Sequence, residues 1–324
     1  MDDRGQLTTE HRNPRSTHLD RMSVERAFDL INAEDSGVAA AVAAARAEIC
    51  RAIDLVVAAF ENGGRLIYVG AGTSGRLGVL DAAECPPTFL SDPRSVQGII
   101  AGGDDALVAS IEGAEDHETD GEAAIEARAV GSSDVVFGIA TGGTTPFVLG
   151  ALRRAAQRGA KTVFLACVPD EQAPTEADVS IRVITGPEVV TGSTRMKAGT
   201  ATKMVLNMVS TIAWVRLGKV YENLMVDVNT GVNAKLVDRG TRMIQAVTGR
   251  TRQDARALLA DAGGRVKIAL VMHARGVDRP SAQTLLAEHG DHVGAIIASA
   301  RTGSSEIHAS PAPGRVDNVL DGAT

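Results

Sequence analysis

The chain has 324 residues, of which 44% are hydrophobic and 3% aromatic, and its formal net charge is −7 at pH 7. A chain of this length and composition is expected to fold around an aliphatic core, and its acidic balance argues against a broad nucleic-acid-binding surface. The three cysteines, Cys50, Cys85 and Cys167, lie far apart without a CxxC pair, which argues against a disulfide framework or a zinc ribbon and favours a reducing, cytoplasmic location.

Residues 1–60 are predicted to form a polar arm followed by helices. Residues 1–22 are polar and contain Asn13-Pro14, so we expect an extended arm. Helical patterning covers residues 23–60, with a break near Ser36-Gly37. Charged side chains interrupt its most apolar stretch, residues 38–60, which is therefore expected to be an amphipathic helix and not a membrane span. The amino-terminal residues also lack the basic and then apolar layout of a signal peptide.

From Arg65 onwards, short apolar segments alternate with helical segments. The five predicted strands are Arg65–Val69, Val96–Ala101, Asp134–Ala140, Lys161–Val168 and Val179–Ile184. Continuous apolar strands that are separated by helices are typical of a parallel sheet covered on both faces. We therefore predict an α/β domain over residues 61–245, built on a five-stranded parallel sheet.

The pattern becomes helical after Gly192. A long helix is predicted over Thr194–Gly218, and three short helices are predicted between Thr251 and Ala300, forming a small subdomain over residues 246–300. The remaining residues, 301–324, are rich in Ser, Pro, Gly and Asp and are predicted to be disordered.

A turn rich in glycines and hydroxyl groups, Gly70-Ala71-Gly72-Thr73-Ser74-Gly75, lies between the first strand and a predicted helix over residues 76–84. The start of a helix offers unpaired N–H groups and the positive end of the backbone dipole, and both favour an anion. We therefore expect a phosphorylated ligand at this turn.

Two kinds of phosphate ligand fit the turn. The spacing satisfies G-x-G-x-x-G, and Asp92 follows at about the 20 residues expected of a dinucleotide site. However, a dinucleotide site requires a central strand directly before the acidic residue, and Pro86 and Pro87 are unfavourable in such a strand. The adjacent hydroxyl groups of Thr73 and Ser74 also suit a compact phosphate monoester, so a sugar phosphate is favoured over a dinucleotide.

Two further turns of the same kind follow predicted strands. Residues 140–146 (Ala-Thr-Gly-Gly-Thr-Thr-Pro) follow the third strand, and residues 191–197 (Thr-Gly-Ser-Thr-Arg-Met-Lys) follow the fifth. Ordinary turn chemistry accounts for any one of them. Because the carboxyl ends of parallel strands meet at one edge of a sheet, the three turns are expected to converge.

These residues resemble the N-acetylmuramic acid 6-phosphate etherases, a family within the sugar isomerase (SIS) domain proteins. The resemblance begins near Thr9 and covers nearly the whole chain. Its most specific stretches are Gly70–Gly78, Asp81–Phe89, Glu112–Asp116 and Thr191–Thr200. The resemblance implies an SIS-type sheet and a cytoplasmic homodimer with sites near the subunit interface, working without metal or organic cofactor.

The implied reaction converts N-acetylmuramic acid 6-phosphate and water to N-acetylglucosamine 6-phosphate and D-lactate, in the recycling of cell-wall sugar. The resemblance assigns the general acid to Glu84 and the second catalytic carboxylate, the base at C2 of the sugar, to Glu115. Pro86 and Pro87 are expected to end the helix predicted over residues 76–84 near Cys85. The negative end of the helix dipole then favours the protonated form of Glu84. Glu115 is expected in a helix starting near Asp104.

The resemblance also implies a set of phosphate contacts. Gly72, Thr73 and Ser74 are expected to hold the 6-phosphate, with further contacts from Ser193 and Thr194. The second turn departs from the family pattern Ser-Gly-Arg-Thr-Pro. Position 142 holds glycine in place of the serine and position 144 holds threonine in place of the arginine, so Thr141 or Thr145 is expected to replace the lost hydroxyl group.

Other polar residues are given lesser roles. Arg195, Lys197 and Lys203 are candidates for offsetting ligand charge, whereas Asp81 is expected to be a cap or a surface charge. His289 and His292 form H-x-x-H, which we interpret as surface residues and not as a metal site.

Two alternative functions remain open at this point. A sugar-phosphate sensor on the same fold would bind the ligand and leave the ether intact, and the altered turn at residues 142–144 is its best support. A nicotinamide-dependent oxidoreductase would use the G-x-G-x-x-G turn for a dinucleotide.

Overall fold

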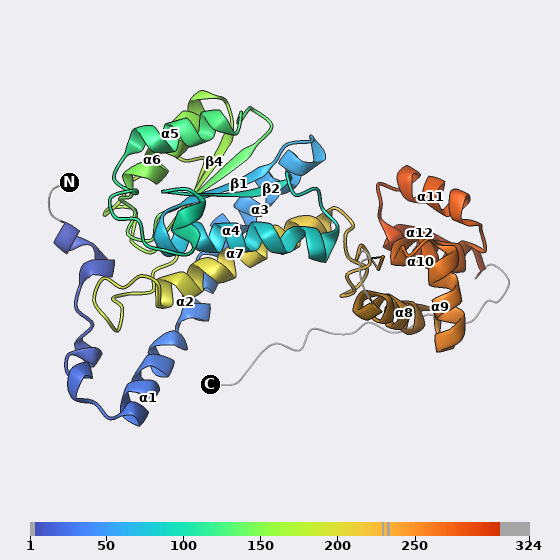
Figure 1. Ribbon diagram of the computed structural model, residues 1–324, viewed down its shortest axis with the longest axis horizontal. Helices are drawn as coiled ribbons and strands as arrows, with labels where there is room; N and C mark the ends of the chain where they lie inside the picture. Colours follow the sequence, from blue (N-terminus) through green and yellow to red (C-terminus); the bar gives the residue numbers. More distant parts are fainter. Residues whose placement is uncertain (1–3, 229, 232–233, 305–324) are drawn as a thin grey trace. The chain divides into compact units, whose positions relative to one another are not determined.

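A computed structural model describes residues 4–228, 230–231 and 234–304, with side chains described up to residue 299. The chain forms two compact units, Met1–Val232 and Asn233–Thr324 (Figure 1). Residues 305–324, most of the predicted disordered tail, lie outside the described residues. No helix in the described ranges combines the length and the apolar character that crossing a membrane requires.

The first unit is built on the predicted five-stranded parallel sheet. Its strands are β1 (Leu66–Gly70), β2 (Val96–Ile100), β3 (Val135–Ile139), β4 (Lys161–Ala166) and β5 (Val179–Arg182). They are arranged in the order β2-β1-β3-β4-β5, and all pair in parallel. Every residue of β1 and β3 is buried, as expected of central strands covered on both faces.

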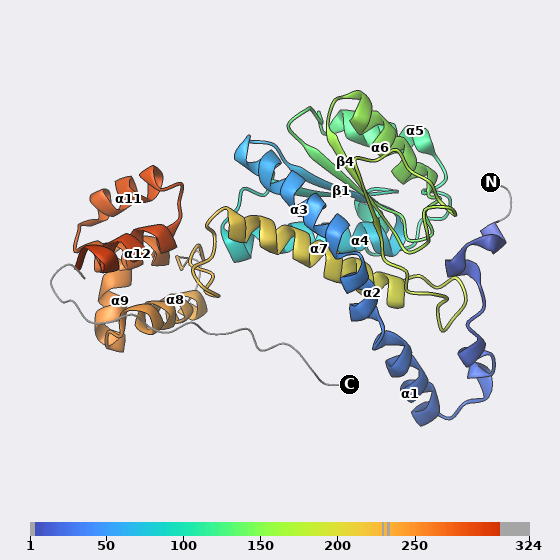
Figure 2. The same ribbon diagram turned by 180° about the vertical axis from the view of Figure 1, so that it is seen from behind.

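Helices cover both faces of this sheet, as Figures 1 and 2 show. One face carries α3 (Arg46–Glu61), α4 (Gly72–Phe89) and α7 (Lys197–Arg216), and the other carries α5 (Glu118–Ala127) and α6 (Pro146–Gln157). Alternate strand residues supply the two cores, so that Tyr68 points into the α3–α4–α7 layer and Ile67 into the α5–α6 layer.

The strand order places a reversal of the chain path between β1 and β3. β1 lies between β2 and β3, and Gly70 at the end of β1 is paired with Ile139 at the end of β3. The chain therefore leaves β1 toward one side of the sheet and leaves β3 toward the other. Such a reversal is where ligands bind in open parallel sheets.

The amino-terminal residues fold into short turns instead of an extended arm. They form four 3₁₀ helices, Arg4–Gln6, Thr8–Glu10, Pro14–Ser16 and Leu19–Arg21. The Asn13 side chain accepts a hydrogen bond from the backbone of Arg15 at 2.9 Å, and this cap bends the segment. Leu7 and Thr9 are buried, so the segment is part of the fold.

The helices α1 (Val24–Asp35) and α2 (Val38–Ala44) follow this segment. The predicted break near Ser36-Gly37 is present, and a second break at Ala45 separates α2 from α3.

Helix α4 is longer than the sequence indicates, because it continues through Pro86 and Pro87 to Phe89. The expected end near Cys85 is wrong. Tertiary packing outweighs the proline penalty here: the Phe89 ring stacks on Trp214 with a centroid distance of 6.1 Å. The left-handed Leu90 then closes the helix by donating its N–H to the Pro86 carbonyl at 2.9 Å.

The second unit is helical. Its described helices are α8 (Ala234–Thr248), α9 (Arg252–Asp261), α10 (Val266–Arg275), α11 (Arg279–Glu288) and α12 (Val293–Ser304). Four helices therefore lie where three are expected after Thr251. Pro280 does not end a helix, because it lies in the first turn of α11, where its fixed φ is tolerated, and Asp278 caps that helix.

Candidate active site

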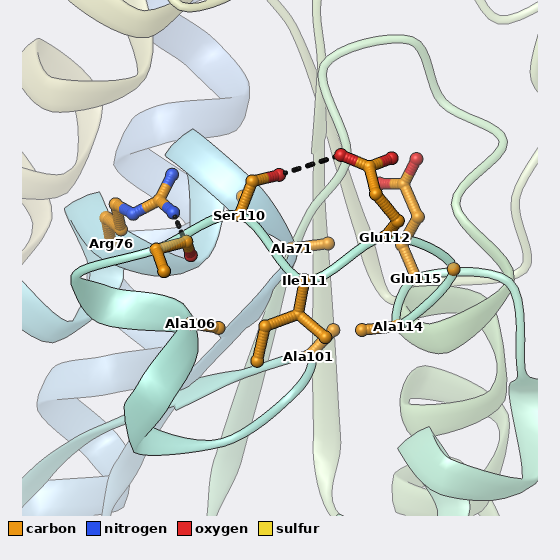
Figure 3. Close-up of a pocket in the computed structure, with 12 residues that line it drawn as sticks. Ala71, Arg76, Ala101, Ala106, Ser110, Ile111, Glu112, Ala114 and Glu115 are labelled. Atoms are coloured by element: carbon orange, nitrogen blue, oxygen red, sulfur yellow. Dashed lines mark hydrogen bonds between the residues drawn. The ribbon is translucent and has the colours of Figure 1, made fainter.

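A cavity of about 160 Å³ lies between the start of α4 and the loop that follows β2 (Figure 3). Ala71, Gly72 and Arg76 line it from the β1–α4 turn and the first turns of α4. Residues 109–115, which include Glu115, line it from the loop. The cavity therefore joins the predicted anion site to one of the two predicted catalytic carboxylates.

The start of α4 is open to a ligand. Its N-cap residue, Ala71, has no side chain to cap the helix, and Gly75 is the first helical residue whose N–H bonds backward, to the Ala71 carbonyl at 3.3 Å. The N–H groups of Gly72, Thr73 and Ser74 therefore belong to the unpaired set of a helix start. Thr73 is half-buried and Ser74 is buried, so their hydroxyl groups are held in place beside these donors.

The tight β1–α4 turn depends on glycine at two positions. A Cβ atom added at Gly70 would lie 2.6 Å from the Gly75 backbone nitrogen, and one added at Gly75 would lie 2.6 Å from the side chain of Ile100. Only glycine therefore allows the strand end and the helix start to approach this closely.

Glu115 lies on a loop, not on the helix expected from the sequence. The segment after β2 forms only a single 3₁₀ turn, Asp104–Leu107, and Gly113 then adopts φ +74°, which a helix does not allow. The Glu115 side chain is exposed toward the pocket in Figure 3. Its backbone carbonyl accepts the Phe147 N–H at 3.0 Å, so the start of α6 holds this end of the loop.

Arg76 holds the other end of the same loop. Its Nε donates to the Leu107 carbonyl at 3.1 Å, and its Nη2 donates to the Ala109 carbonyl at 2.9 Å. The loop that carries Glu115 is thus tied to α4 and to α6, and its catalytic candidate has a fixed backbone position.

Glu84 does not share the pocket with Glu115 in this chain. It lies twelve residues after Gly72 on α4, which places it about 18 Å along the helix axis from the anion site. It is exposed and lies more than one turn before the helix end at Phe89. The helix dipole therefore does not favour the protonated form of Glu84, since its effect is confined to the last turn of a helix.

The α4 residues next to Glu84 are anchored in the core. Asp81 is buried, contrary to the sequence expectation, and accepts hydrogen bonds from Tyr68 (2.9 Å), Asn207 (2.7 Å) and Ser210 (3.1 Å). Burial and then the Asp81 charge raise the pKa of the Cys85 thiol to about 12, so this cysteine is not a nucleophile. The network fixes α4 against β1 and α7.

The third turn lies beside the first, but the start of α7 is already occupied. A Cβ atom added at Gly199 would lie 3.5 Å from both the Thr194 carbonyl oxygen and the Thr73 side chain. The fully buried Glu188 accepts the N–H groups of Lys197 (3.0 Å) and Ala198 (2.9 Å). A carboxylate of the protein thus takes the place of a ligand anion at this helix start.

Lys197 is not available to a ligand, in contrast to the sequence expectation. It is buried, and its Nζ pairs with Glu34 at 2.5 Å, while Arg15 pairs with the same carboxylate at 2.8 Å. Burial raises the pKa of Glu34, but the hydrogen bond and the charge of Lys197, together with weaker contributions, outweigh it and leave that pKa lowered. Arg195 and Lys203 are exposed.

The second turn carries Thr141, which is buried, and Thr145, which is half-buried at the N-cap of α6 without a side-chain cap bond. The amino-terminal segment covers this turn: a Cβ atom added at Gly142 would lie 3.6 Å from the Thr9 Oγ1. That hydroxyl group is buried and has no hydrogen-bond partner among the described residues. The sequence did not single out Thr9 for any role.

The dinucleotide interpretation is not supported by the strand positions. Asp92 precedes β2 (Val96–Ile100), so it lies at the edge opposite to the glycine turn, whereas a ribose-binding acid follows its strand. Its partner is Arg94, at 2.6 Å, and hydrogen bonds from Arg94 lower its pKa to about 2. Across the described ranges, no three His, Cys, Asp or Glu side chains gather closely enough to hold a metal ion.

Residues 48–156 match the glucokinase regulatory protein N-terminal SIS domain, and residues 114–212 match the SIS domain. An N-acetylmuramic acid 6-phosphate etherase of Nostoc punctiforme is 53% identical over 92% of this chain and 97% of that protein. Proteins of the same name from Crocosphaera subtropica and Synechocystis are 55% and 52% identical, over 89% and 90% of this chain and 94% and 96% of theirs.

Proposed function

The chain belongs to the family of N-acetylmuramic acid 6-phosphate etherases, and we propose that it cleaves the D-lactyl ether of this sugar with two carboxylates, Glu84 and Glu115. The products are N-acetylglucosamine 6-phosphate and D-lactate, so the enzyme is a carbon–oxygen lyase of amino sugar catabolism and peptidoglycan recycling. The observation that carries this proposal is the cavity that joins the open start of α4 to Glu115.

The start of α4 suits the 6-phosphate of the substrate. The N–H groups of Gly72, Thr73 and Ser74 and the two hydroxyl groups beside them are donors for a phosphate monoester, and the helix dipole adds a favourable field. The neighbouring turns supply further hydroxyl groups for the same ligand. These belong to Thr141, Thr145, Ser193 and Thr194.

The chemistry needs an acid and a base, and no step in it requires a metal or an organic cofactor. In the ring-opened sugar, C1 is an aldehyde, so the hydrogen on C2 is acidic and the ether oxygen on C3 is a β leaving group. Removing the C2 proton and protonating the ether oxygen breaks the C3–O bond, releases lactate and leaves a conjugated aldehyde. Water then adds to C3 while a proton returns to C2.

Glu115 suits the role of base at C2. Its carboxylate faces the pocket next to the anion site (Figure 3), and its backbone is held by α6. A sugar whose phosphate lies at the start of α4 therefore extends toward this side chain. After elimination, the protonated Glu115 returns its proton to C2.

Glu84 suits the role of general acid when it comes from a second subunit. A single chain separates Glu84 from the anion site by about 18 Å of helix, which exceeds the span of one monosaccharide. Glu84 lies one turn after Leu80, and this exposed leucine, together with Met208, Ile212 and Val215 of the adjacent α7, forms an apolar face. We infer that this face, called the α4–α7 face below, forms the interface of a cytoplasmic homodimer.

Release of D-lactate tests this assignment. Wild-type enzyme incubated with N-acetylmuramic acid 6-phosphate is expected to release D-lactate, while Glu84→Gln and Glu115→Gln are expected to reduce kcat by at least about 100-fold, the usual contribution of acid or base catalysis. Glu112→Gln is the matched control, because Glu112 lines the same pocket from the same loop and takes part in neither proposed proton transfer.

The outcomes separate the candidate functions. Normal lactate release by Glu84→Gln or Glu115→Gln would show that the residue has been wrongly assigned. Binding of the sugar phosphate by the wild-type protein without any lactate release would instead indicate a sugar-phosphate sensor on the same fold.

A further inference from the structure

One positively charged side chain lines the proposed active-site pocket. Its twelve lining residues include a single Lys, Arg or His, which is Arg76. Arg76 lies one turn after Gly72 on α4, so it points from the same side of the helix that carries the proposed phosphate site. The side chain is half-buried, which strengthens its interaction with an anion relative to an exposed arginine.

The guanidinium group of Arg76 is held in a fixed orientation, but not all of its N–H groups have an acceptor among the described residues. Its Nε and Nη2 donate to the carbonyls of Leu107 and Ala109, which fixes the plane of the group. Its Nη1 donates to none of the described residues and is left for a ligand. Because its orientation is already fixed by the loop, little side-chain entropy is lost when a ligand accepts from it.

The side of the pocket opposite Arg76 repels a carboxylate. Figure 3 shows the guanidinium group of Arg76 on one side of the pocket and the carboxylates of Glu112 and Glu115 on the other. Ser110 lies between them, but its hydroxyl group donates to Glu112 at 3.1 Å. A ligand with a carboxyl group is therefore expected to orient that group toward Arg76.

The substrate of the proposed reaction carries such a group. N-acetylmuramic acid 6-phosphate has two anions, the 6-phosphate and the lactyl carboxylate, and only the phosphate is accounted for by the start of α4. We propose that Arg76 binds the lactyl carboxylate and thereby determines specificity for the lactyl ether over the sugar phosphate that lacks it. This inference rests on the proposed function, and it gives Arg76 a role beyond fixing the loop.

The consequence is a defined position for the leaving group. With the phosphate at the start of α4 and the lactyl carboxylate on Arg76, the ether oxygen between them is held against rotation about the C3–O bond. The product sugar lacks this second contact, so it is expected to bind more weakly than the substrate, which favours its release.

Binding to a catalytically silenced enzyme tests the inference. In a Glu115→Gln background, the Kd for N-acetylmuramic acid 6-phosphate and for N-acetylglucosamine 6-phosphate is measured by calorimetry, with and without Arg76→Gln. Loss of a charge-assisted hydrogen bond is expected to weaken binding of the lactyl sugar by about 30-fold, while the Kd for the sugar without the lactyl group changes by less than about twofold. Arg128→Gln, which removes an arginine from a different pocket, is the matched control.

Each other outcome rejects the inference. An equal loss for both ligands would mean that Arg76 acts on what the two sugars share, by positioning the loop or by contacting the 6-phosphate. An unchanged Kd for the lactyl sugar would mean that Arg76 does not contact the carboxylate. Retained binding of N-acetylglucosamine 6-phosphate shows that the variant is folded. Lactate release by the wild-type enzyme is measured separately, so failure of the proposed function is recognised independently of this result.

Discussion

The hydroxyl group of Thr9 is buried beside Gly142 without a hydrogen-bond partner among the described residues. A buried, unsatisfied hydroxyl group costs about 1–3 kcal/mol. Gly142 has no positive φ, and an added Cβ atom would make only ordinary contacts, at 3.6 Å or more. A serine at this position therefore fits, and its hydroxyl group is within reach of Thr9.

We expect Gly142→Ser to be more stable than Gly142→Ala by about 1 kcal/mol, because both variants add the same Cβ atom and only serine offers Thr9 a partner. Denaturant unfolding followed by the fluorescence of Trp214, the single tryptophan, measures the difference. In a Thr9→Val background the two variants should be equally stable. A difference that persists there would show that serine acts through another contact.

The roles of individual residues were predictable where a short motif determines them. The turn at residues 70–75 was expected to open a helix next to a strand, and α4 does begin at Gly72. Burial of Asp81 was not predictable, because its three partners come from β1 and from a helix more than 120 residues away. The role of Arg76 in the pocket was not predicted, because in the sequence it is indistinguishable from other polar residues on a helix.

The starts of β1 and β3 are joined by an ion pair. Asp134 accepts hydrogen bonds from the Arg65 side chain, the shortest at 2.7 Å, and from the Gly131 backbone at 2.9 Å. Burial raises the pKa of Asp134, but the hydrogen bond and charge of Arg65 and the backbone bonds outweigh it and leave that pKa below its ordinary value of 3.8. The ionised carboxylate therefore stabilises the folded sheet.

Replacing this carboxylate should destabilise the protein in a pH-dependent way. Because the folded pKa is lowered, the stabilisation is present above pH 3.8 and is lost as the pH falls through the folded value. Asp134→Asn is expected to lower the free energy of unfolding by about 2–3 kcal/mol at neutral pH, and by clearly less near pH 3. Unfolding monitored by Trp214 fluorescence at both pH values measures this, with the exposed Asp54→Asn as control. An equal loss at both values would contradict the account.

Strands and helices were predicted best where one physical signal dominates. All five strands follow from continuous apolar segments, and the observed bounds differ from the predicted ones by no more than two residues. Errors arose where tertiary contacts override local signals. Packing of Phe89 on Trp214 carries α4 through two prolines, and Gly113 together with the start of α6 holds Glu115 on a loop.

The proposed role of the α4–α7 face as a dimer interface can be tested directly. If this face forms the dimer interface, a charge at its centre should dissociate the dimer, and the two catalytic carboxylates should then no longer meet. Ile212→Glu is expected to sediment as a monomer and to lose at least about 100-fold in kcat. Ala156→Glu on α6 adds the same charge on the opposite face of the sheet and should change neither property. A fully active Ile212→Glu monomer would show that one chain is sufficient.

The family resemblance implies a homodimer with sites near the subunit interface, and the proposed dimer would give that arrangement a physical reason. The family resemblance, and no pattern in the residues themselves, gives Glu84 and Glu115 as candidates. The length of α4 then places Glu84 about 18 Å from the anion site of its own chain. The glycine turns predict a site at the carboxyl edge of the sheet for a different reason: parallel strands bring their carboxyl ends together whatever lies between them.

Exchange of the C2 hydrogen in deuterated water tests the central claim most directly, since it separates the two proton transfers. The account predicts that Glu84→Gln still exchanges the C2 hydrogen of N-acetylmuramic acid 6-phosphate for deuterium without releasing lactate, and that Glu115→Gln does neither. Deuterium at C2, detected by NMR in substrate recovered from Glu115→Gln, would contradict it.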